Sequence, residues 1–190
     1  MPRRISKRTS WWVLIVTILV AVAQHYGWLN TAQQKMTVVP PGQYRVTEFF
    51  DGDTIAVDMN GSNEKIRFIG VDTPETHDPR KAVQCFGKAA ANFTKTLIGN
   101  QSVRLEADPL SSNRDRYNRL LRYVYLPNNT LVNAEIIRQG YGFAYVSFPF
   151  SKSDEFLAYQ KEAREQNRGL WNSCQPKPNQ YGGYTSNNAQ

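Results

Sequence analysis

The sequence has few residues that bind transition metals or form covalent cross-links. It contains two cysteines and two histidines among 190 residues, with neither a Cys-x-x-Cys pair nor a histidine cluster. A structural zinc site, which needs four such ligands at close spacing, is therefore not expected. No internal repeat runs through the chain, which argues against a solenoid or a propeller. The length predicts one globular domain with tails.

A large surplus of basic charge is also missing from the body of the chain. The whole sequence has 23 Lys and Arg against 16 Asp and Glu, a formal net charge of +7. Four basic residues precede the first apolar run, and without them 19 basic residues face 16 acidic ones, about +3. A polyanion would therefore be bound by a few placed arginines and a metal ion, and not by a broad basic surface.

The first 23 residues are typical of a targeting segment. A basic stretch precedes an apolar run from Trp11 to Ala23, which ends in small residues suited to signal cleavage. The alternative is an uncleaved anchor, because Gly27, Trp28 and Leu29 extend the run toward the ~20 residues of a bilayer span. We expect a signal peptide over 1–23, a flexible linker over 24–42, and a secreted or periplasmic protein. In the alternative, the protein is membrane-anchored and faces outward.

The two cysteines, Cys85 and Cys174, fit an oxidising compartment in which they could form one bridge. The alternative is two unrelated thiols. From Gln175 onward the chain is polar and rich in Gly, Pro and Asn, so a disordered tail is expected over 175–190. The globular domain is then expected over 43–174.

This central segment predicts strands mainly in its first half and helices mainly in its second. Asn60-Gly61-Ser62-Asn63 is a hairpin signal between two alternating apolar segments. The order of elements favours the α+β class with a small, mostly antiparallel barrel. The expected strands are Tyr44–Phe49, Thr54–Met59, Lys65–Val71, Ser102–Ala107 and Leu120–Leu126, and the expected helices are Phe86–Ile98, Leu131–Gln139 and Ser153–Asn167.

Two acidic residues mark a candidate metal site. Asp53 lies in an Asp-Gly-Asp turn just before one expected strand, and Asp72 lies just past the end of the next. Antiparallel pairing through the Asn60-Gly61 hairpin would bring these two ends together. Two carboxylates with a backbone carbonyl and waters suit calcium, which accepts about 6–8 oxygen ligands.

Each position also has a purely structural interpretation. Asp53 could serve turn geometry, and Asp72 could cap a loop or helix. Glu75 could be a solvated charge, and Arg67 could occupy the wet face of a half-buried strand. No single residue decides between the two interpretations.

Their combination resembles the staphylococcal nuclease family over roughly Gln43 to Trp171. The matching blocks occur in the family's order and with similar spacing, and the set is far more specific than any one block. The blocks are DGDT at 51–54, IRFIGVDTPET at 66–76, FGKAA from 86, DRYNR at 115–119, LVNAEIIRQGYGFAYV at 131–146 and NRGLW at 167–171.

The resemblance implies an OB-like, five-stranded β-barrel with three α-helices. It implies a calcium-dependent enzyme that hydrolyses DNA and RNA, single strands preferred, and leaves 3′-phosphate ends. In this sequence Asp53, Asp72 and the carbonyl of Thr73 match the family's calcium ligands. A monomer is expected.

The resemblance also assigns roles around the phosphate. Arg67 and Arg119 match the residues that clamp it, and Glu75 matches the one that orients or deprotonates the attacking water. Tyr117 and Tyr145 match tyrosines that border the nucleotide pocket. Paired arginines suit this task because a planar guanidinium donates two parallel hydrogen bonds to phosphate oxygens.

The sequence departs from the family pattern at two positions. Asn118 stands where the family usually has glycine, and asparagine tolerates a left-handed backbone better than most residues. Ser147 replaces a second pocket tyrosine, which puts base stacking in doubt. The rival class is an OB-type module that binds nucleic acid without cutting it. Such a module is free to lose the acidic and arginine positions, all of which are present here.

Overall fold

The structure is a computed structural model that describes residues 7–25, 42–76, 82–180 and 183–188. The chain divides into two units, Met1–Val38 and Val39–Gln190. The first unit contains helix α1 (Lys7–His25), in which the side chains from 11 to 22 are exposed. Among the described helices, none combines the length and apolar character that crossing a membrane requires. The expected linker over 24–42 falls almost entirely outside the described residues.

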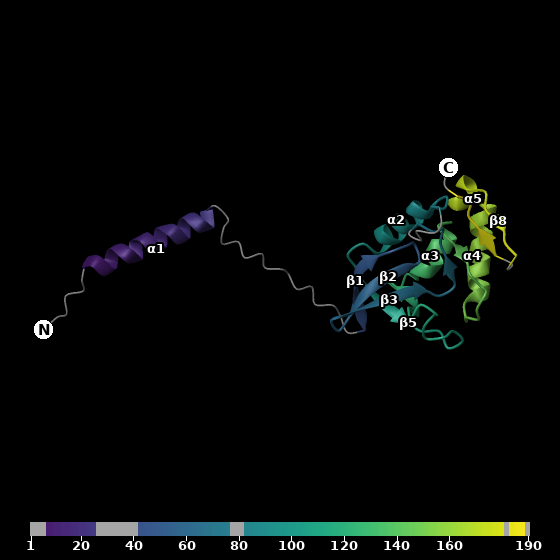
Figure 1. Cartoon of the computed structure of the whole chain (residues 1–190), viewed down its shortest axis with the longest axis horizontal. Helices are drawn as coiled ribbons and strands as arrows, with labels where there is room; N and C mark the ends of the chain where they lie inside the picture. Colours follow the sequence, from purple (N-terminus) through teal and green to yellow (C-terminus); the bar gives the residue numbers. More distant parts are fainter. Residues whose placement is uncertain (1–6, 26–41, 77–81, 181–182, 189–190) are drawn as a thin grey trace. The chain divides into compact units, whose positions relative to one another are not determined.

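The second unit is built on a closed barrel of five strands. These are β1 (Gln43–Phe49), β2 (Thr54–Met59), β3 (Ser62–Phe68), β5 (Ser102–Glu106) and β6 (Leu120–Tyr125). Their order around the barrel is β1-β2-β3-β6-β5, and β1 closes on β5. Only the pairing of β3 with β6 is parallel among these strands. The expected α+β class with a five-stranded, OB-like barrel is confirmed (Figure 1).

Local sequence explains the β2–β3 hairpin. Asn60 and Gly61 have φ of 57° and 85°, the left-handed pair that a two-residue hairpin turn needs. The register pairs Met59 with Ser62 and, at the far end, Thr54 with Arg67. In β3, Ile66 and Phe68 are buried in the core and Arg67 lies between them on the other face.

The prediction of one strand over Lys65–Val71 is wrong at its C-terminal end. β3 stops at Phe68, and a turn at Ile69–Gly70 leads to a separate short strand, β4 (Val71–Asp72). Gly70 has φ of +71°, and a Cβ there would lie 2.6 Å from the Phe150 ring. This turn directs β4 away from the barrel to pair with β7 (Phe143–Ala144). A propensity pattern cannot reveal the change because the residues remain apolar throughout.

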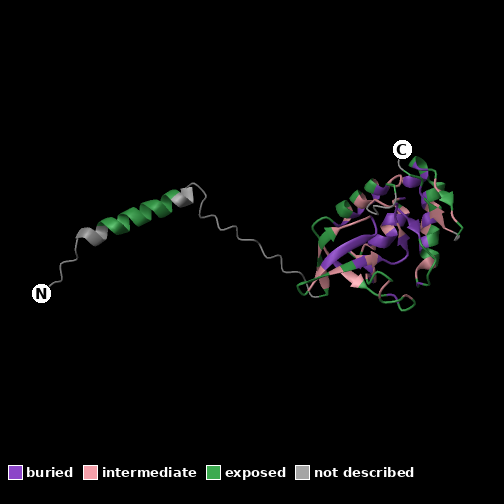
Figure 2. Ribbon diagram, in the orientation of Figure 1, coloured by how far each residue is buried: buried purple, intermediate pink, exposed green. Residues whose placement is uncertain are grey.

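Helices cover the barrel as expected, with one addition. They are α2 (Gly87–Ile98), α3 (Val132–Arg138), α4 (Ser153–Glu165) and the short α5 (Leu170–Ser173). Figure 1 shows the barrel strands on one side of this unit and α4, α5 and β8 on the other. Apolar side chains from the strands, α3 and α4 form one core, and Phe143, Leu170 and Trp171 form a second, smaller cluster. In Figure 2 many residues of the barrel strands are buried, while many residues of the surrounding helices are exposed.

A buried polar cluster fastens the segment before α4 to the barrel. Asp108, 4% exposed, accepts hydrogen bonds at Oδ2 from the Tyr123 hydroxyl (2.7 Å), the Ser151 amide (2.8 Å) and the Ser151 hydroxyl. The Leu110 amide donates to Oδ1 at 2.8 Å. Burial raises the pKa of Asp108, but these four hydrogen bonds outweigh it and lower the pKa to about 2.

Replacing this carboxylate should destabilise the protein in a pH-dependent way. A pKa lowered from 3.8 to about 2 means that ionised Asp108 stabilises the fold. The contribution is about 2 kcal/mol above pH 4, and it is lost as the pH falls from about 4 to about 2. At pH 7, Asp108→Asn should therefore lower the free energy of unfolding by at least about 2 kcal/mol. The NH₂ group of the asparagine would face hydrogen-bond donors and could not accept from them. The difference from the unsubstituted protein should shrink toward pH 2. Urea unfolding at several pH values measures it.

Glu106→Gln is the matched control for this prediction. Glu106 is half-exposed on β5 and pairs with surface Arg104 at 3.0 Å. A surface pair of this kind contributes about 0–1 kcal/mol. Equal losses in the two variants at pH 7 would contradict the assignment of a special role to Asp108.

The expectation of a disordered tail over 175–190 is wrong for the described residues 175–180 and 183–188. They form a small hairpin of β8 (Lys177–Pro178) and β9 (Tyr184–Thr185), and Ser186 is buried. The Tyr184 ring lies against Trp171 (centroids 4.9 Å apart) and Phe143 (6.2 Å). Composition suggested disorder, but one aromatic side chain in the second cluster and a covalent bond nearby hold the segment.

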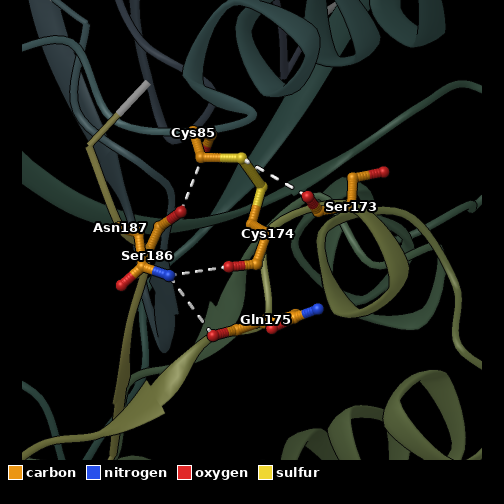
Figure 3. The surroundings of a disulfide bond; sticks show 6 residues. All are labelled: Cys85, Ser173, Cys174, Gln175, Ser186 and Asn187. Atoms are coloured by element: carbon orange, nitrogen blue, oxygen red, sulfur yellow. Dashed lines mark hydrogen bonds between the residues drawn. A yellow bond between two sulfur atoms is a disulfide. The ribbon is translucent and has the colours of Figure 1, made fainter. Parts of the chain in front are cut away.

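That bond is a disulfide between Cys85 and Cys174, 89 residues apart in sequence (Figure 3). The Cα atoms are 5.8 Å apart, within the usual range for a bridge. Cys85 lies just before α2 and Cys174 just after α5, so the bridge joins the start of one helix to the end of another. Figure 3 shows Ser186 and Asn187 of the C-terminal segment beside it.

Candidate active site

The barrel brings the two acidic positions to one end of a strand pair. Asp53 immediately precedes β2 and Asp72 ends β4, and the Phe68 amide donates to the Asp53 carbonyl at 2.9 Å. Because Thr54 pairs with Arg67, the start of β2 lies beside the end of β3. The turn at Ile69–Gly70 then returns the chain so that Thr73 also reaches Asp53.

Asp53 is the buried centre of this arrangement, with 5% of its surface exposed. Its Oδ2 accepts hydrogen bonds from the Thr73 amide (2.9 Å) and the Thr73 hydroxyl (3.0 Å). Its Oδ1 accepts from the Thr54 hydroxyl at 2.9 Å. A buried carboxylate needs such partners, since an unpaired one would be too costly to desolvate.

The guanidinium of Arg67 lies between the two carboxylates. Its Nη1 is 3.2 Å from Asp53 Oδ2, and its Nη2 is 3.3 Å from Asp72 Oδ1. Nη1 also donates to the Val71 carbonyl at 2.6 Å. The Arg67 side chain is only 14% exposed, whereas that of Asp72 is 48% exposed. The cluster therefore has a buried end at Asp53 and an open end at Asp72.

Arg119 reaches the same cluster through Thr54. Its Nη1 lies 3.4 Å from the Thr54 hydroxyl oxygen, and that hydroxyl donates to Asp53. Its Nε and Nη2 are both 2.7 Å from Asp115 Oδ2, which fixes the plane of the guanidinium. Arg67 and Arg119 are thus both placed around the Asp53 end of the site.

Asp115 is a residue that sequence reasoning left without a role. Its Oδ1 accepts from the amides of Tyr117 (2.9 Å) and Arg119 (3.0 Å), closing a tight turn. Asn118 has φ of 65° in this turn, as expected for a position where the family has glycine. Burial raises the pKa of Asp115, but the Arg119 amide and guanidinium lower it more. The Asp-x-x-x-Arg spacing of the DRYNR block is the signal that could have revealed it.

Glu75 lies in the loop that follows β4. Its amide donates to Gln84 Oε1 at 2.8 Å, and its own Oε1 accepts from the Thr76 amide at 2.9 Å. The Thr76 hydroxyl donates to Asp51 Oδ1 at 2.5 Å, so the loop is linked to the Asp-Gly-Asp turn. Gln84 was not identified from sequence, and no local pattern distinguishes it.

The two candidate pocket tyrosines lie in different surroundings. Tyr117 is 62% exposed, with the guanidinium carbons of Arg116 and Arg119 lying 4.7 Å and 5.3 Å from its ring centre. Tyr145 lines a cavity of about 280 Å³ together with Asp72, Ser147 and Tyr184, and Tyr117 is not among the lining residues. The cavity therefore borders the open end of the acidic cluster and is partly built by the C-terminal hairpin.

The donor atoms of the cluster suit a hard cation. The two carboxylates and the Thr73 carbonyl are oxygen ligands, which calcium and magnesium prefer. Within the described residues, no group of three or more His, Cys, Asp and Glu side chains forms a complete metal cage. An ion held by Asp53 and Asp72 would take its remaining ligands from backbone carbonyl, water and substrate.

Comparison with known proteins identifies the family. Residues 65–173 match the family described as staphylococcal nuclease homologue. The chain is 38% identical to a thermonuclease of Staphylococcus intermedius over 160 residues, covering 84% of this chain and 94% of that protein. The chain belongs to the staphylococcal nuclease family. The match of the family model includes Arg67, Asp72, Glu75 and Arg119, and it ends one residue before Cys174.

Other members of the family show the same relationship. A thermonuclease of Staphylococcus hyicus is 40% identical over 131 residues, 68% of this chain and 76% of that protein. Endonuclease YncB of Bacillus subtilis is 37% identical over 123 residues, 64% of this chain and 57% of that protein. The staphylococcal nuclease fold expected from the sequence blocks is therefore confirmed.

Proposed function

We propose that this nuclease hydrolyses the phosphodiester bonds of DNA and RNA with calcium, leaving 3′-phosphate and 5′-hydroxyl ends. One observation carries the proposal: Arg67 lies within 3.3 Å of both Asp53 and Asp72, and Arg119 lies 3.4 Å from Thr54, which binds Asp53. Two guanidiniums and two carboxylates around one point suit the binding of a cation and a phosphate together.

The acidic residues and the arginines of the site would have different roles. Asp53, Asp72 and the Thr73 carbonyl would hold calcium, which supplies charge neutralisation and a site for water beside the phosphate. Arg67 and Arg119 would donate hydrogen bonds to the non-bridging oxygens, where negative charge increases in the transition state. Asp115 keeps the Arg119 guanidinium in one plane, so little reorganisation is needed.

Glu75 would orient or deprotonate the attacking water. A carboxylate can act as general base when it reaches the water directly or through a second water. Glu75 lies three residues after Asp72, and its loop is tied to the Asp-Gly-Asp turn through Thr76. Calcium held by Asp53 and Asp72 would supply the water on which Glu75 acts.

Substrate contacts would extend from the cluster toward exposed aromatic rings. Tyr117 and Tyr145 offer such rings, and stacking on one is worth about 1–3 kcal/mol per base. Unpaired bases are free to stack, which supports single strands as the preferred substrate.

The protein would act as a monomer and be exported, as the apolar N-terminal segment suggests. Extracellular calcium would help to fill a site with only two carboxylates.

One assay tests this proposal against the non-catalytic alternative. The purified protein is incubated with single-stranded DNA, with calcium or with a calcium chelator, and the product ends are identified. Cleavage that requires calcium and yields 3′-phosphate ends is expected. Binding without cleavage would favour the non-catalytic module, and 5′-phosphate products would contradict the proposed mechanism.

A further inference from the structure

Gln84 binds the backbone of Glu75 at two points. The Glu75 amide donates to Gln84 Oε1 at 2.8 Å, and the Gln84 amide donates to the Glu75 carbonyl at 2.9 Å. Both backbone polar groups of Glu75 are therefore bound to the same residue. Loss of Oε1 would leave the Glu75 amide without this acceptor and weaken the attachment of the loop at Glu75.

The start of α2 limits the loop on one side. The Gly87 amide donates to the Gln84 carbonyl at 3.1 Å. A Cβ on Gly87 would lie 2.6 Å from Thr76 Cγ2 and 3.0 Å from the Glu75 carbonyl oxygen. The helix backbone thus touches the loop directly, and only glycine permits that approach.

The C-terminal segment holds Gln84 and Cys85 on the other side. Asn188 forms an antiparallel bridge with Gln84, and the Cys85 amide donates to the Asn187 carbonyl at 2.7 Å. Ser186, 5% exposed, donates its hydroxyl to the Cys85 carbonyl at 2.8 Å. Figure 3 shows Ser186 and Asn187 next to the disulfide that joins Cys85 to Cys174.

The C-terminal segment also binds the second cysteine of the disulfide, Cys174. The Asn187 side chain donates to the Cys174 carbonyl at 2.9 Å, so the segment binds both partners of the bridge. The disulfide keeps these two ends together, and the C-terminal segment pairs with the chain next to it. This segment lies beyond residues 65–173, the part of the chain that matches the family model.

We propose that Gln84 is a positioning residue for Glu75, and that the Cys85–Cys174 bridge with residues 186–188 holds Gln84 in place. In this proposal, residues 186–188 support the active site through Gln84 and Cys85. The inference rests on the proposed function, in which Glu75 acts on the attacking water. A general base must be placed accurately, and an error of about 1 Å can cost on the order of 10²-fold in rate.

Replacement of Gln84 provides the first test. Gln84→Met keeps the length of the side chain and removes the oxygen acceptor. We expect kcat to fall about 10- to 100-fold, with KM for single-stranded DNA and the calcium dependence unchanged. Gln84→Glu restores a strong acceptor and should recover most of kcat, which a merely structural role would not predict.

Gln101→Ala is the control for general effects of glutamine replacement. Gln101 is exposed just after α2, and its side chain donates to the Leu97 carbonyl at a long 3.4 Å. Its kcat should equal that of the unsubstituted protein. If Gln84→Met melts below the assay temperature, Gln84→Ala is assayed in its place at a temperature where it is folded by circular dichroism.

Removal of the bridge provides the second test. The full-length Cys85→Ala/Cys174→Ala variant and the unsubstituted protein are assayed with and without a dithiol reductant, at a temperature where both are folded. Reduction should lower kcat of the unsubstituted protein to the value of the double variant, on which the reductant has no effect. Full kcat after complete reduction, verified by mass spectrometry, would overturn the role of the bridge.

Glu75→Gln, assayed in parallel, separates this inference from the proposed function. If the unsubstituted protein shows no calcium-dependent cleavage, the proposed function fails and the inference fails with it. If Glu75→Gln is inactive while Gln84→Met retains full kcat, only the positioning role is overturned. A low kcat in Gln84→Met that Gln84→Glu does not recover would also overturn it.

Discussion

Arg67→Lys should slow phosphodiester cleavage about 10²- to 10³-fold, the cost of removing one well-placed donor to transition-state charge. The lysine ammonium keeps the positive charge but lacks the planar fork that reaches two oxygens at once. The present contacts show how that fork is used, with Nη1 at Asp53 and Nη2 at Asp72. Single-turnover cleavage of a labelled oligonucleotide at saturating calcium measures the effect.

The fold should survive this change. The Arg67 side chain lies on the face of β3 opposite to Ile66 and Phe68, so no core apolar contact is lost. Lys can still approach the Val71 carbonyl, which Nη1 contacts at 2.6 Å. Arg45→Lys is the control, because Arg45 is 65% exposed and forms a surface pair with Asp58. Equal cleavage rates for Arg67→Lys and the unsubstituted protein would remove Arg67 from the proposed mechanism.

Asp53→Asn should have a comparable or larger effect, because it removes half of the carboxylate charge available for calcium. Affinity for calcium depends on the number of charged ligands, so the dissociation constant should rise at least about tenfold. Loss of the ion from the transition state removes several kcal/mol, on the order of 10³-fold in kcat. Calorimetric titration with calcium and cleavage assays over a range of calcium concentrations measure the two effects separately.

Structural damage from this substitution has to be distinguished from loss of the metal. Asp53 also accepts from the Thr73 amide and hydroxyl, so some loss of stability is expected. The control is Asp154→Asn, an exposed residue in the first turn of α4, which should not change calcium binding. If Asp53→Asn stays folded and binds calcium as the unsubstituted protein does, the proposed ligand set is wrong.

The sequence predicted those parts of the fold that depend on neighbours in the chain. The Asn60-Gly61 turn and the alternation around Arg67 specify the hairpin, because φ and strand period are local properties. Sequence reasoning failed where a distant contact intervened. Gly70 changes the direction of the chain after Phe68, and the reason is its packing against Phe150, 80 residues later.

The candidate site shows the same division. Asp53, Arg67 and Asp72 could be chosen from their spacing and from the family blocks, and the barrel register explains why they meet. Asp115 and Gln84 could not be chosen in this way, because each acts by binding another site residue. Asp115 orients Arg119, and Gln84 binds the backbone of Glu75. Such support becomes visible only when the chain is folded.

By itself, the sequence determined the class of protein: a small α+β barrel with acidic and arginine residues at the ends of adjacent strands. Short-range spacing and strand pairing are enough for that. Only the tertiary structure decided that Cys85 bonds to Cys174 and that Ser186 and Asn187 bind beside them. Composition favoured disorder because few apolar groups are present, but the nearby cross-link and the packing of half-buried Tyr184 against Trp171 offset the entropy cost of ordering this segment.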